Sequence, residues 1–426
     1  MEVILHKLTI LFRDHALRKR ILFVLGALAV FRVLAAIPVP GVDQTSLTEF
    51  LGSNQFFGLL NVFSGGGLSN LSIVMLGVGP YITASITMQL LTIVFPQIKA
   101  MYQEDGEAGR MKFMQYSRML TVPLALIQGF SFLILLQRQG VIGDLSAVDI
   151  VTNVLVITAG SMLVMWIGEL MTEFGVGNGV SIIIFAGIVA ALPGAISQLI
   201  FTYDPSQIPT YVAFLVVAFI IILGVVLINE AERPIPITYA KRVRGQRVYG
   251  GTSTYLPLRV NQAGVMPIIF ALSLLLFPQL IVSFLASSGI GGPGFQAFLV
   301  NFSENILSNL WVYGGSYFIL VFLFTYFYTA VTFDPEQISK NLQRSGAFVP
   351  GVRPGDSTSQ YIGKILTRVT LVGAVFLGFI AVLPIVMQGI TGISTLAIGG
   401  TGLLIVVSVI IDLVKRVDAQ TTSREY

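Results

Sequence analysis

The sequence predicts an all-α integral membrane protein in which ten transmembrane helices form two halves of five. Three observations lead to this fold class. Of the 426 residues, 54% are hydrophobic and only 11% are charged, whereas about a quarter of the residues in an ordinary soluble protein are charged. Apolar segments of membrane-spanning length recur along the whole chain. The basic residues gather in alternate connections between these segments, as is typical of a multi-spanning protein.

The ten spans follow from length and polarity. A helix that crosses a hydrocarbon layer of about 30 Å needs about 20 mainly apolar residues. Ten segments meet this requirement, and in chain order they are residues 21–37, 74–95, 116–136, 153–172, 180–201, 210–229, 263–285, 310–332, 366–388 and 396–414. In residues 1–20, apolar residues recur at helical spacing among charged ones, which predicts an amphipathic helix on the membrane surface.

The basic residues also orient the spans, because lysine and arginine accumulate in cytoplasmic loops. Of the 25 lysines and arginines, all except Arg32 and Arg138 lie at the termini or in and near the second, sixth and eighth connections. The first, fifth, seventh and ninth connections hold none. Both termini are therefore predicted to be cytoplasmic. Arg32 lies near the outer end of the first span, so we expect its side chain to reach outward to the interface.

Composition argues against several function classes. The chain has no cysteine, so it can form neither a thiolate metal site nor a cysteine nucleophile. Its two histidines, His6 and His15, both precede the first span. It contains no phosphate-binding GxxxxGK[ST] motif, so energy from a nucleotide must be supplied by another protein. We therefore expect a protein that is not an enzyme and that holds neither a metal nor a cofactor.

The spans divide the chain into two halves, residues 21–201 and 210–415. An external hinge is expected at residues 202–209 and a short cytoplasmic tail at residues 416–426. Because each half has an odd number of spans, an internal repeat would be inverted across the membrane. The sequence therefore favours two inverted five-helix halves.

An unusual segment precedes the second span. Residues 56–72 are apolar and uncharged, too short to cross the membrane, and interrupted by Gly65, Gly66 and Gly67. Non-helical backbone at membrane depth occurs only where protein buries it or water reaches it. The residues alone leave two interpretations open: a re-entrant segment that fills a cavity, or a loop that lies on the outer interface.

Two cytoplasmic connections, residues 230–261 and 334–364, are far longer than most connections and therefore point to a function. The first predicts a hairpin with a glycine turn that presents Arg244 and Arg247 at its tip. In the second, proline and glycine frame Arg353. Such cationic loops can dock an acidic protein surface or RNA phosphate, and the alternative is charge that only sets topology. For Arg353 we favour docking.

Seven motifs, spread over nearly the whole chain, resemble the SecY family, the channel subunit of the bacterial Sec protein translocase. They are Ile37-Pro-Val-Pro-Gly-Val, Phe63-Ser-Gly-Gly-Gly-Leu, Gly79-Pro-Tyr-Ile-Thr-Ala-Ser-Ile, Gly175-Val-Gly-Asn-Gly-Val-Ser-Ile-Ile-Ile, Tyr239-Ala-Lys-Arg, Leu256-Pro-Leu-Arg-Val-Asn and Gly346-Ala-Phe-Val-Pro-Gly-Val-Arg-Pro-Gly. They occur in the order and on the sides of the membrane that the family requires.

The resemblance implies a protein-conducting channel in the bacterial cytoplasmic (inner) membrane that passes unfolded secretory polypeptides and releases transmembrane segments sideways into lipid. The glycine-rich segment, residues 59–72, then corresponds to a re-entrant plug helix, and its candidate residues are Leu60, Asn61, Phe63, Ser64, Gly65, Gly66, Gly67 and Leu68. A ring of aliphatic side chains is expected to form the pore constriction. By motif these are Val78, Ile82, Val180, Ile184, Ile269 and Ile405.

The resemblance further assigns a polar cluster at the lateral gate to Gln89, Gln128 and Asn261, and docking of a motor or ribosome to Arg244, Arg247 and Arg353. Without the resemblance, the six ring residues would be ordinary helix packing, and the alternative for the amides is a buried pair with no gating role. The implied partners are SecE-like and SecG-like small membrane subunits, the SecA motor ATPase, the ribosome, signal sequences with nascent polypeptides, and membrane lipid. The predicted tail is shorter than in many relatives, which puts motor contacts through a longer tail in doubt.

The alternative function is a secondary transporter, because inverted repeats and a broken helix are equally typical of that class. Such proteins place ionisable groups near the middle of the membrane to couple ions or protons. The predicted span interiors hold almost none, and this favours the channel.

Overall fold

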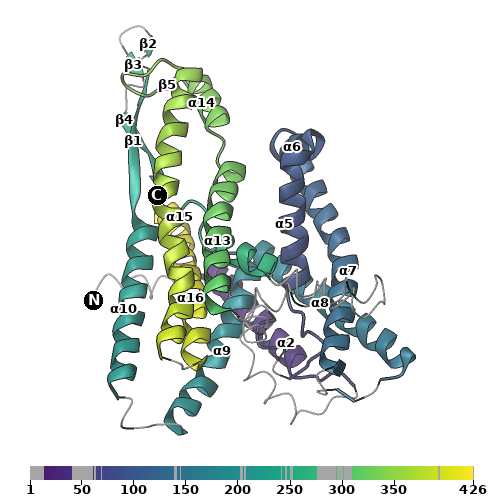
Figure 1. The fold of residues 1–426 in the computed structure, drawn as a ribbon. Helices are drawn as coiled ribbons and strands as arrows, with labels where there is room; N and C mark the ends of the chain where they lie inside the picture. Colours follow the sequence, from purple (N-terminus) through teal and green to yellow (C-terminus); the bar gives the residue numbers. More distant parts are fainter. Residues whose placement is uncertain are drawn as a thin grey trace.

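The computed structural model describes residues 14–40, 61, 64–68, 70–138, 142, 143, 145–201, 205, 208–240, 242–244, 247–249, 253–275, 294, 301, 309–391 and 394–425. Within them the protein is mainly helical, with a small sheet at one end of the helices (Figure 1). Residues 1–13 of the predicted surface helix, and most of the predicted hinge at 202–209, lie outside the described residues.

Helices lie at all ten predicted span positions. In chain order these helices are α2 (His15–Ala35), α5 (Gly79–Val94) followed by α6 (Pro96–Gln103) at the second position, α7 (Gly106–Arg138), α8 (Ala147–Phe174), α9 (Gly179–Phe201), α10 (Ile208–Glu230), Met266–Leu275, α13 (Leu310–Thr332), α15 (Asp356–Thr391) and α16 (Ser394–Glu425). Five of the described helices are long and apolar enough to cross a bilayer alone, or six if α5 and α6, bent by 113°, count as one broken span.

Local signals explain several helix starts. The side chain of Asp14 accepts a hydrogen bond from the backbone N–H of Ala16 and caps α2. Ser146 and Asp149 form a reciprocal capping box at α8, which satisfies backbone N–H groups that have no partner within the helix. Proline lies in the first turn of α5, where its missing N–H costs nothing.

The second predicted span begins differently from the expectation. We predicted helix from residue 74, but residues 73–78 form turns and α5 starts at Gly79. Neighbouring segments supply hydrogen bonds to this irregular backbone. The N–H of Val39 donates to Leu71 O at 2.8 Å, and Ser161 Oγ on α8 donates to Gly77 O at 2.8 Å. Irregular backbone at membrane depth is thereby buried in protein, as it must be.

The helices pack in two groups (Figure 1). In one group α5 packs on α7, α7 on α8, and α8 on α9 and α2; in the other, α13 packs on α15, α15 on α16, and α16 on α10. Contact between α9 and α16 joins the two groups. The largest apolar core cluster lies where they meet, and it includes buried residues from both.

The two long connections fold together. In the first, β1 (Glu232–Tyr239) pairs antiparallel with β4 (Ser253–Arg259), and β2 (Arg242–Arg244) with β3 (Arg247–Tyr249). In the second, β5 (Ala347–Phe348) follows α14 (Pro335–Arg344) and pairs with the end of β1, so the sheet order is β4-β1-β5. A small core of Ile235, Leu258, Val349 and Ile362 covers this sheet, which makes the two connections one structural unit.

Two helices extend beyond the spans that hydropathy predicts. The predicted tail, residues 416–426, continues α16 as helix through Glu425, and α15 already begins at Asp356 within the predicted second loop. Both helices extend beyond the apolar segments because hydropathy marks only the part of a helix that lies in lipid.

The close contact between α8 and the irregular backbone generates a prediction. A Cβ added at Gly160 would lie 2.0 Å from Ile73 O, so Gly160→Ala is expected to lower the free energy of unfolding by about 1–3 kcal/mol through overpacking. Thermal unfolding of the purified protein measures this change. Gly26→Ala on α2 is the control, because an added Cβ there meets nothing within 4 Å. Equal melting temperatures for the two variants would contradict the prediction.

Candidate functional site

The structure brings the six predicted ring residues into one apolar cluster. Val78 immediately precedes α5, and Ile82 lies on that helix; Val180 and Ile184 lie on α9, and Ile405 on α16. Ile269 lies on the helix Met266–Leu275. Five of them are at most 5% exposed, and Val180 packs against the same cluster. The six candidates therefore share one large apolar core, to which α2, α8, α10, α13 and α15 also contribute.

Close backbone contact sets the position of Val180. The N–H of Gly179 donates to Thr172 Oγ1 at 2.8 Å, and that hydroxyl donates to Gly168 O at 2.9 Å. A Cβ added at Gly179 would lie 2.0 Å from Gly168 O, so only glycine fits. The start of α9 is thus fixed against the end of α8, and the aliphatic cluster is held by polar contacts beside it.

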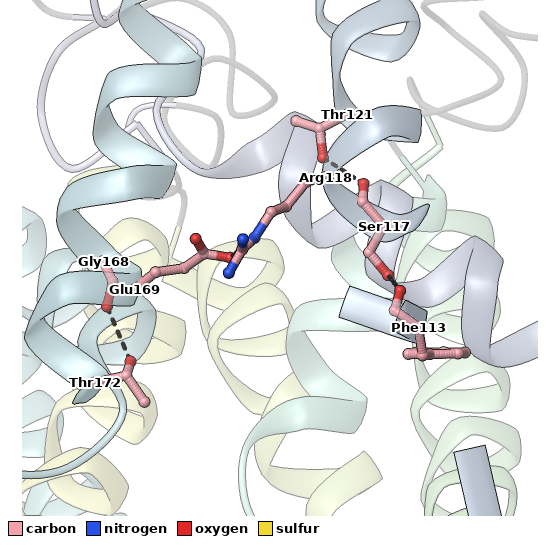
Figure 2. Close-up of polar contacts among 7 residues, drawn as sticks. All are labelled: Phe113, Ser117, Arg118, Thr121, Gly168, Glu169 and Thr172. Atoms are coloured by element: carbon pink, nitrogen blue, oxygen red, sulfur yellow. Dashed lines mark hydrogen bonds and ion pairs between the residues drawn. The ribbon is translucent and has the colours of Figure 1, made fainter. Parts of the chain in front are cut away.

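An ion pair that sequence reasoning missed lies one residue from this contact. Figure 2 shows Arg118 of α7 reaching Glu169 of α8, with an Nε to Oε1 distance of 2.7 Å. The Glu169 side chain is 18% exposed and that of Arg118 is 42% exposed. The phenol of Tyr81 on α5 interacts electrostatically with both. The sequence signal was one acid and one base near the adjacent ends of two successive spans, which does not by itself predict pairing.

The described turn of the glycine-rich segment, residues 64–68, is largely buried inside the protein. Ser64 Oγ donates to Asn61 O and accepts from the N–H of Leu68, both at 3.0 Å. Ser64 is fully buried, and Leu68 is 1% exposed within an apolar cluster formed with α7 and α8. This burial favours the re-entrant interpretation over a loop on the outer interface. The predicted plug residues Leu60 and Phe63 lie outside the described residues.

The three predicted gate amides do not hydrogen-bond to one another in the described structure. Gln89 Nε2 lies 3.4 Å from Ser85 Oγ on its own helix, and Gln128 is buried on α7. Asn261 Nδ2 instead donates to Asn229 Oδ1 at 2.8 Å. A shared gate cluster therefore stays a prediction.

The Asn229–Asn261 pair lines a cavity of about 260 Å³. The cavity also contacts Ser408 on α16, to which Asn229 Nδ2 donates at 3.4 Å. Ile182 lines it too and belongs to the core cluster that contains the predicted ring residues. A cavity with a mixed polar and apolar lining therefore lies beside this cluster, between α9, α16 and the start of the helix Met266–Leu275.

The predicted docking residues lie in the connections. The register of β2 and β3 pairs Arg244 with Arg247 at the hairpin tip, so the predicted hairpin is confirmed. Arg353 lies in the turn between β5 and α15, where its carbonyl accepts a hydrogen bond from Thr358 Oγ1 at 2.9 Å. On α14, the hydrogen bond from Lys340 lowers the pKa of the exposed Glu336 carboxyl.

Comparison with known proteins gives consistent results. A family model described as SecY matches residues 72–414. The chain is 44% identical to the protein translocase subunit SecY of Mycobacterium bovis, and the alignment covers 96% of each protein. It is 42% identical to the protein of the same name from Synechocystis, with 96% of this chain and 93% of that protein aligned.

Solved structures share the fold. A structure described as "The structure of a protein conducting channel" aligns with a TM-score of 0.64 at 18% identity, covering 95% of this chain and 93% of that one. One that reports the plug domain of SecY and the closed state of its translocation channel aligns with a TM-score of 0.66 at 20% identity and the same coverage. Sec61 in a canine ribosome-channel complex aligns with a TM-score of 0.62 at 18% identity, also over 95% and 93%.

The Arg118–Glu169 pair is expected to stabilise the contact between α7 and α8. In a double-mutant cycle with Arg118→Gln and Glu169→Gln, we expect a coupling energy of about 1 kcal/mol, at the upper end for partly exposed pairs. Thermal or denaturant unfolding measures it. The control is the same cycle at Glu336 and Lys340, whose side chains are 64% and 60% exposed, and its coupling should be smaller. Equal coupling in the two cycles would show that burial adds nothing at Glu169.

Proposed function

The chain belongs to the SecY family, and on that premise we propose how its residues act as the protein-conducting channel subunit of a Sec translocon. The channel passes unfolded secretory polypeptides across the membrane and releases transmembrane segments sideways into lipid. The observation that carries the proposal is the single cluster in which aliphatic side chains of α5, α9, α16 and the helix Met266–Leu275 meet.

These aliphatic side chains act as the constriction of the pore. They form no directional bonds, so they can close around polypeptide segments of any sequence. When the pore is empty, an aliphatic constriction resists wetting by water and ions. Val78 and Val180 are smaller than isoleucine, so the closed ring is slightly wider at these two positions. The neighbouring cavity beside Asn261 is the chamber from which a polypeptide enters the ring.

The segment of residues 59–72 acts as the plug. Its burial, with Ser64 and Leu68 inside the protein, supports a role in blocking the idle channel. Gly65, Gly66 and Gly67 let the backbone lie close to the surrounding helices. Together with Leu60, Asn61 and Phe63, these residues leave the pore when a polypeptide passes.

The lateral gate opens between α5 and α7 on one side and the helix Met266–Leu275 and α13 on the other. Gln89 and Gln128 face this opening in our proposal, with Asn261 at its edge. A hydrogen bond between neutral amides on two membrane helices stabilises their contact by about 1 kcal/mol. This stabilisation favours a closed gate but is small enough for the gate to open. Signal sequences enter at this gate.

The joined cytoplasmic connections dock the partners. Arg244 and Arg247 at the hairpin tip and Arg353 in the turn present cationic groups, which favour the SecA motor ATPase and the ribosome. The ribosome-channel complex of the Sec61 structure supports the second partner. SecE-like and SecG-like subunits complete the complex, which lies in the bacterial inner membrane with both termini cytoplasmic. The subunit itself catalyses no reaction, and its motor supplies the energy.

A secondary transporter is the less favoured function. The inverted halves and the broken span fit either class, but family membership and the aliphatic ring favour the channel. Ion coupling would need ionisable groups at the centre of the spans.

The pore assignment is tested by photo-crosslinking. A photoreactive amino acid at Ile82 or Ile184 should form adducts with a secretory chain arrested during translocation, because both residues lie in the ring. Ile220 on α10, which is 59% exposed on the outer surface, is the control and should react with lipid instead. The pore assignment fails if adducts with the arrested chain are absent at both ring positions.

The plug assignment is tested by deletion. Removing residues 59–72 should raise the resting ion conductance of reconstituted channels severalfold, because the ring alone then separates the two aqueous sides. Planar-bilayer recording without a translocating chain measures this conductance. An unchanged conductance would reassign the segment to a structural loop.

A further inference from the structure

Arg32 occupies a position where a charge is costly. It lies on α2 within the first span, and a charged side chain at membrane depth is usually retained for a function. The expectation that it reaches outward to the interface is wrong. Its Nη2 donates a hydrogen bond to the carbonyl oxygen of Ala186 on α9. The guanidinium is therefore directed across to a second helix.

The glycine-rich segment lies between the same two helices. A Cβ added at Gly65 would be 2.5 Å from Cζ of Phe31 on α2. A Cβ added at Gly187 on α9 would be 2.2 Å from the Cα of Gly65. The backbone of Gly65 is therefore pressed between α2 and α9, and neither glycine leaves room for a side chain.

Arg32 also lies close to this segment. A Cβ added at Gly66 would lie 3.2 Å from Arg32 Nη1 and 4.0 Å from Gly187 O. The carbon at the centre of the guanidinium lies 5.5 Å from the ring centroid of Phe31, which is within the range of a cation–π interaction. Two consecutive residues of α2 thus lie beside two consecutive glycines, Phe31 beside Gly65 and Arg32 beside Gly66.

We propose that Arg32 is a positioning residue for the plug: its guanidinium fastens the glycine turn at residues 64–68 between α2 and α9 in the closed channel. A guanidinium has five N–H donors in a rigid fork, so one edge can hold α9 while the other faces the turn. Charge-assisted hydrogen bonds of this kind are about twice as strong as neutral ones. The inference rests on the proposed role of residues 59–72 as the plug.

The chain contains no cysteine, so a single introduced thiol reports on the turn. Ser64→Cys places the thiol at a fully buried position, where a membrane-impermeant maleimide reacts only when the turn leaves its seat. In the intact translocon complex in vesicles, adding Arg32→Gln should accelerate labelling about tenfold, the equivalent of one lost hydrogen bond to a charged group. Arg32→Lys should give an intermediate rate, because an ammonium lacks the second edge of the fork.

Two controls separate release of the turn from general loosening. Ser131→Cys on α7 is also fully buried, and its labelling rate should not change with Arg32→Gln. Arg20→Gln removes an exposed cation from the same helix and should leave Ser64→Cys labelling unchanged. An equal rise at Ser64→Cys and Ser131→Cys would mean that Arg32 only stabilises the fold, which overturns the inference.

A second variant tests the position of the turn between α2 and α9 without altering charge. Gly187→Ala places a methyl group against Gly65 and should also accelerate labelling of Ser64→Cys, whereas Gly194→Ala on the same helix, where an added Cβ meets nothing within 4 Å, should not. Should Arg32→Gln fail to fold, Arg32→Lys and Gly187→Ala decide the question, and unchanged labelling in both overturns the inference.

The outcomes also distinguish this inference from the plug assignment. If deletion of residues 59–72 raises resting conductance while the Arg32 variants leave labelling unchanged, the plug stands and Arg32 does not hold it. If the deletion leaves conductance unchanged, the plug assignment itself fails, whatever the labelling rates.

Discussion

The architecture depends on one constraint: the irregular backbone of residues 71–78 lies among membrane-spanning helices and must find every hydrogen bond within the protein. Unpaired backbone groups at that depth cost several kcal/mol each. The loop after α2 supplies part of what is needed, since Val39 N–H binds Leu71 O and Ile37 O binds the N–H of Ile73. From α8, Ser161 binds Gly77 O, and Gly160 lets the two backbones approach closely. These contacts fix where α5 begins, and with it the positions of Val78 and Ile82.

Two kinds of interaction hold the helices together, and they lie in different places. Polar contacts with defined geometry hold the frame: Thr172 fixes the start of α9, and Arg118 binds Glu169 between α7 and α8. The centre, in contrast, contains aliphatic side chains that attract without direction. A seal built in this way can separate and close again around different polypeptides, because no specific bond has to be re-formed. These polar contacts lie beside the aliphatic cluster that we propose as the seal, rather than within it.

The positions of the spans could be predicted because hydropathy and helix length are local properties of the chain. The hairpin at Arg244 and Arg247 was equally predictable, because in the sequence two short runs of strand-forming residues lie on either side of a glycine. Helix ends outside the apolar segments could not be predicted in this way. For example, α16 continues through Glu425, where no apolar pattern marks the helix. The pairing of β5 with β1 joins residues more than a hundred positions apart in the chain, and the sequence of neither segment indicates its partner. The outward direction predicted for Arg32 failed because that rule considers one helix and its depth, without the neighbour that accepts its hydrogen bond.

By itself, the sequence determined the membrane class, the ten helical segments, the distribution of basic residues and, through its motifs, the family. Tertiary structure alone decided which side chains meet. It paired Asn261 with Asn229 rather than with the amides of α5 and α7, seated Gly65 against Gly187, and gathered the aliphatic residues of four helices into one cluster. The physical reason is that periodicity, hydropathy and turn chemistry act over a few neighbouring residues. A hydrogen bond or a close backbone contact depends on distances between segments that only the packed helices define.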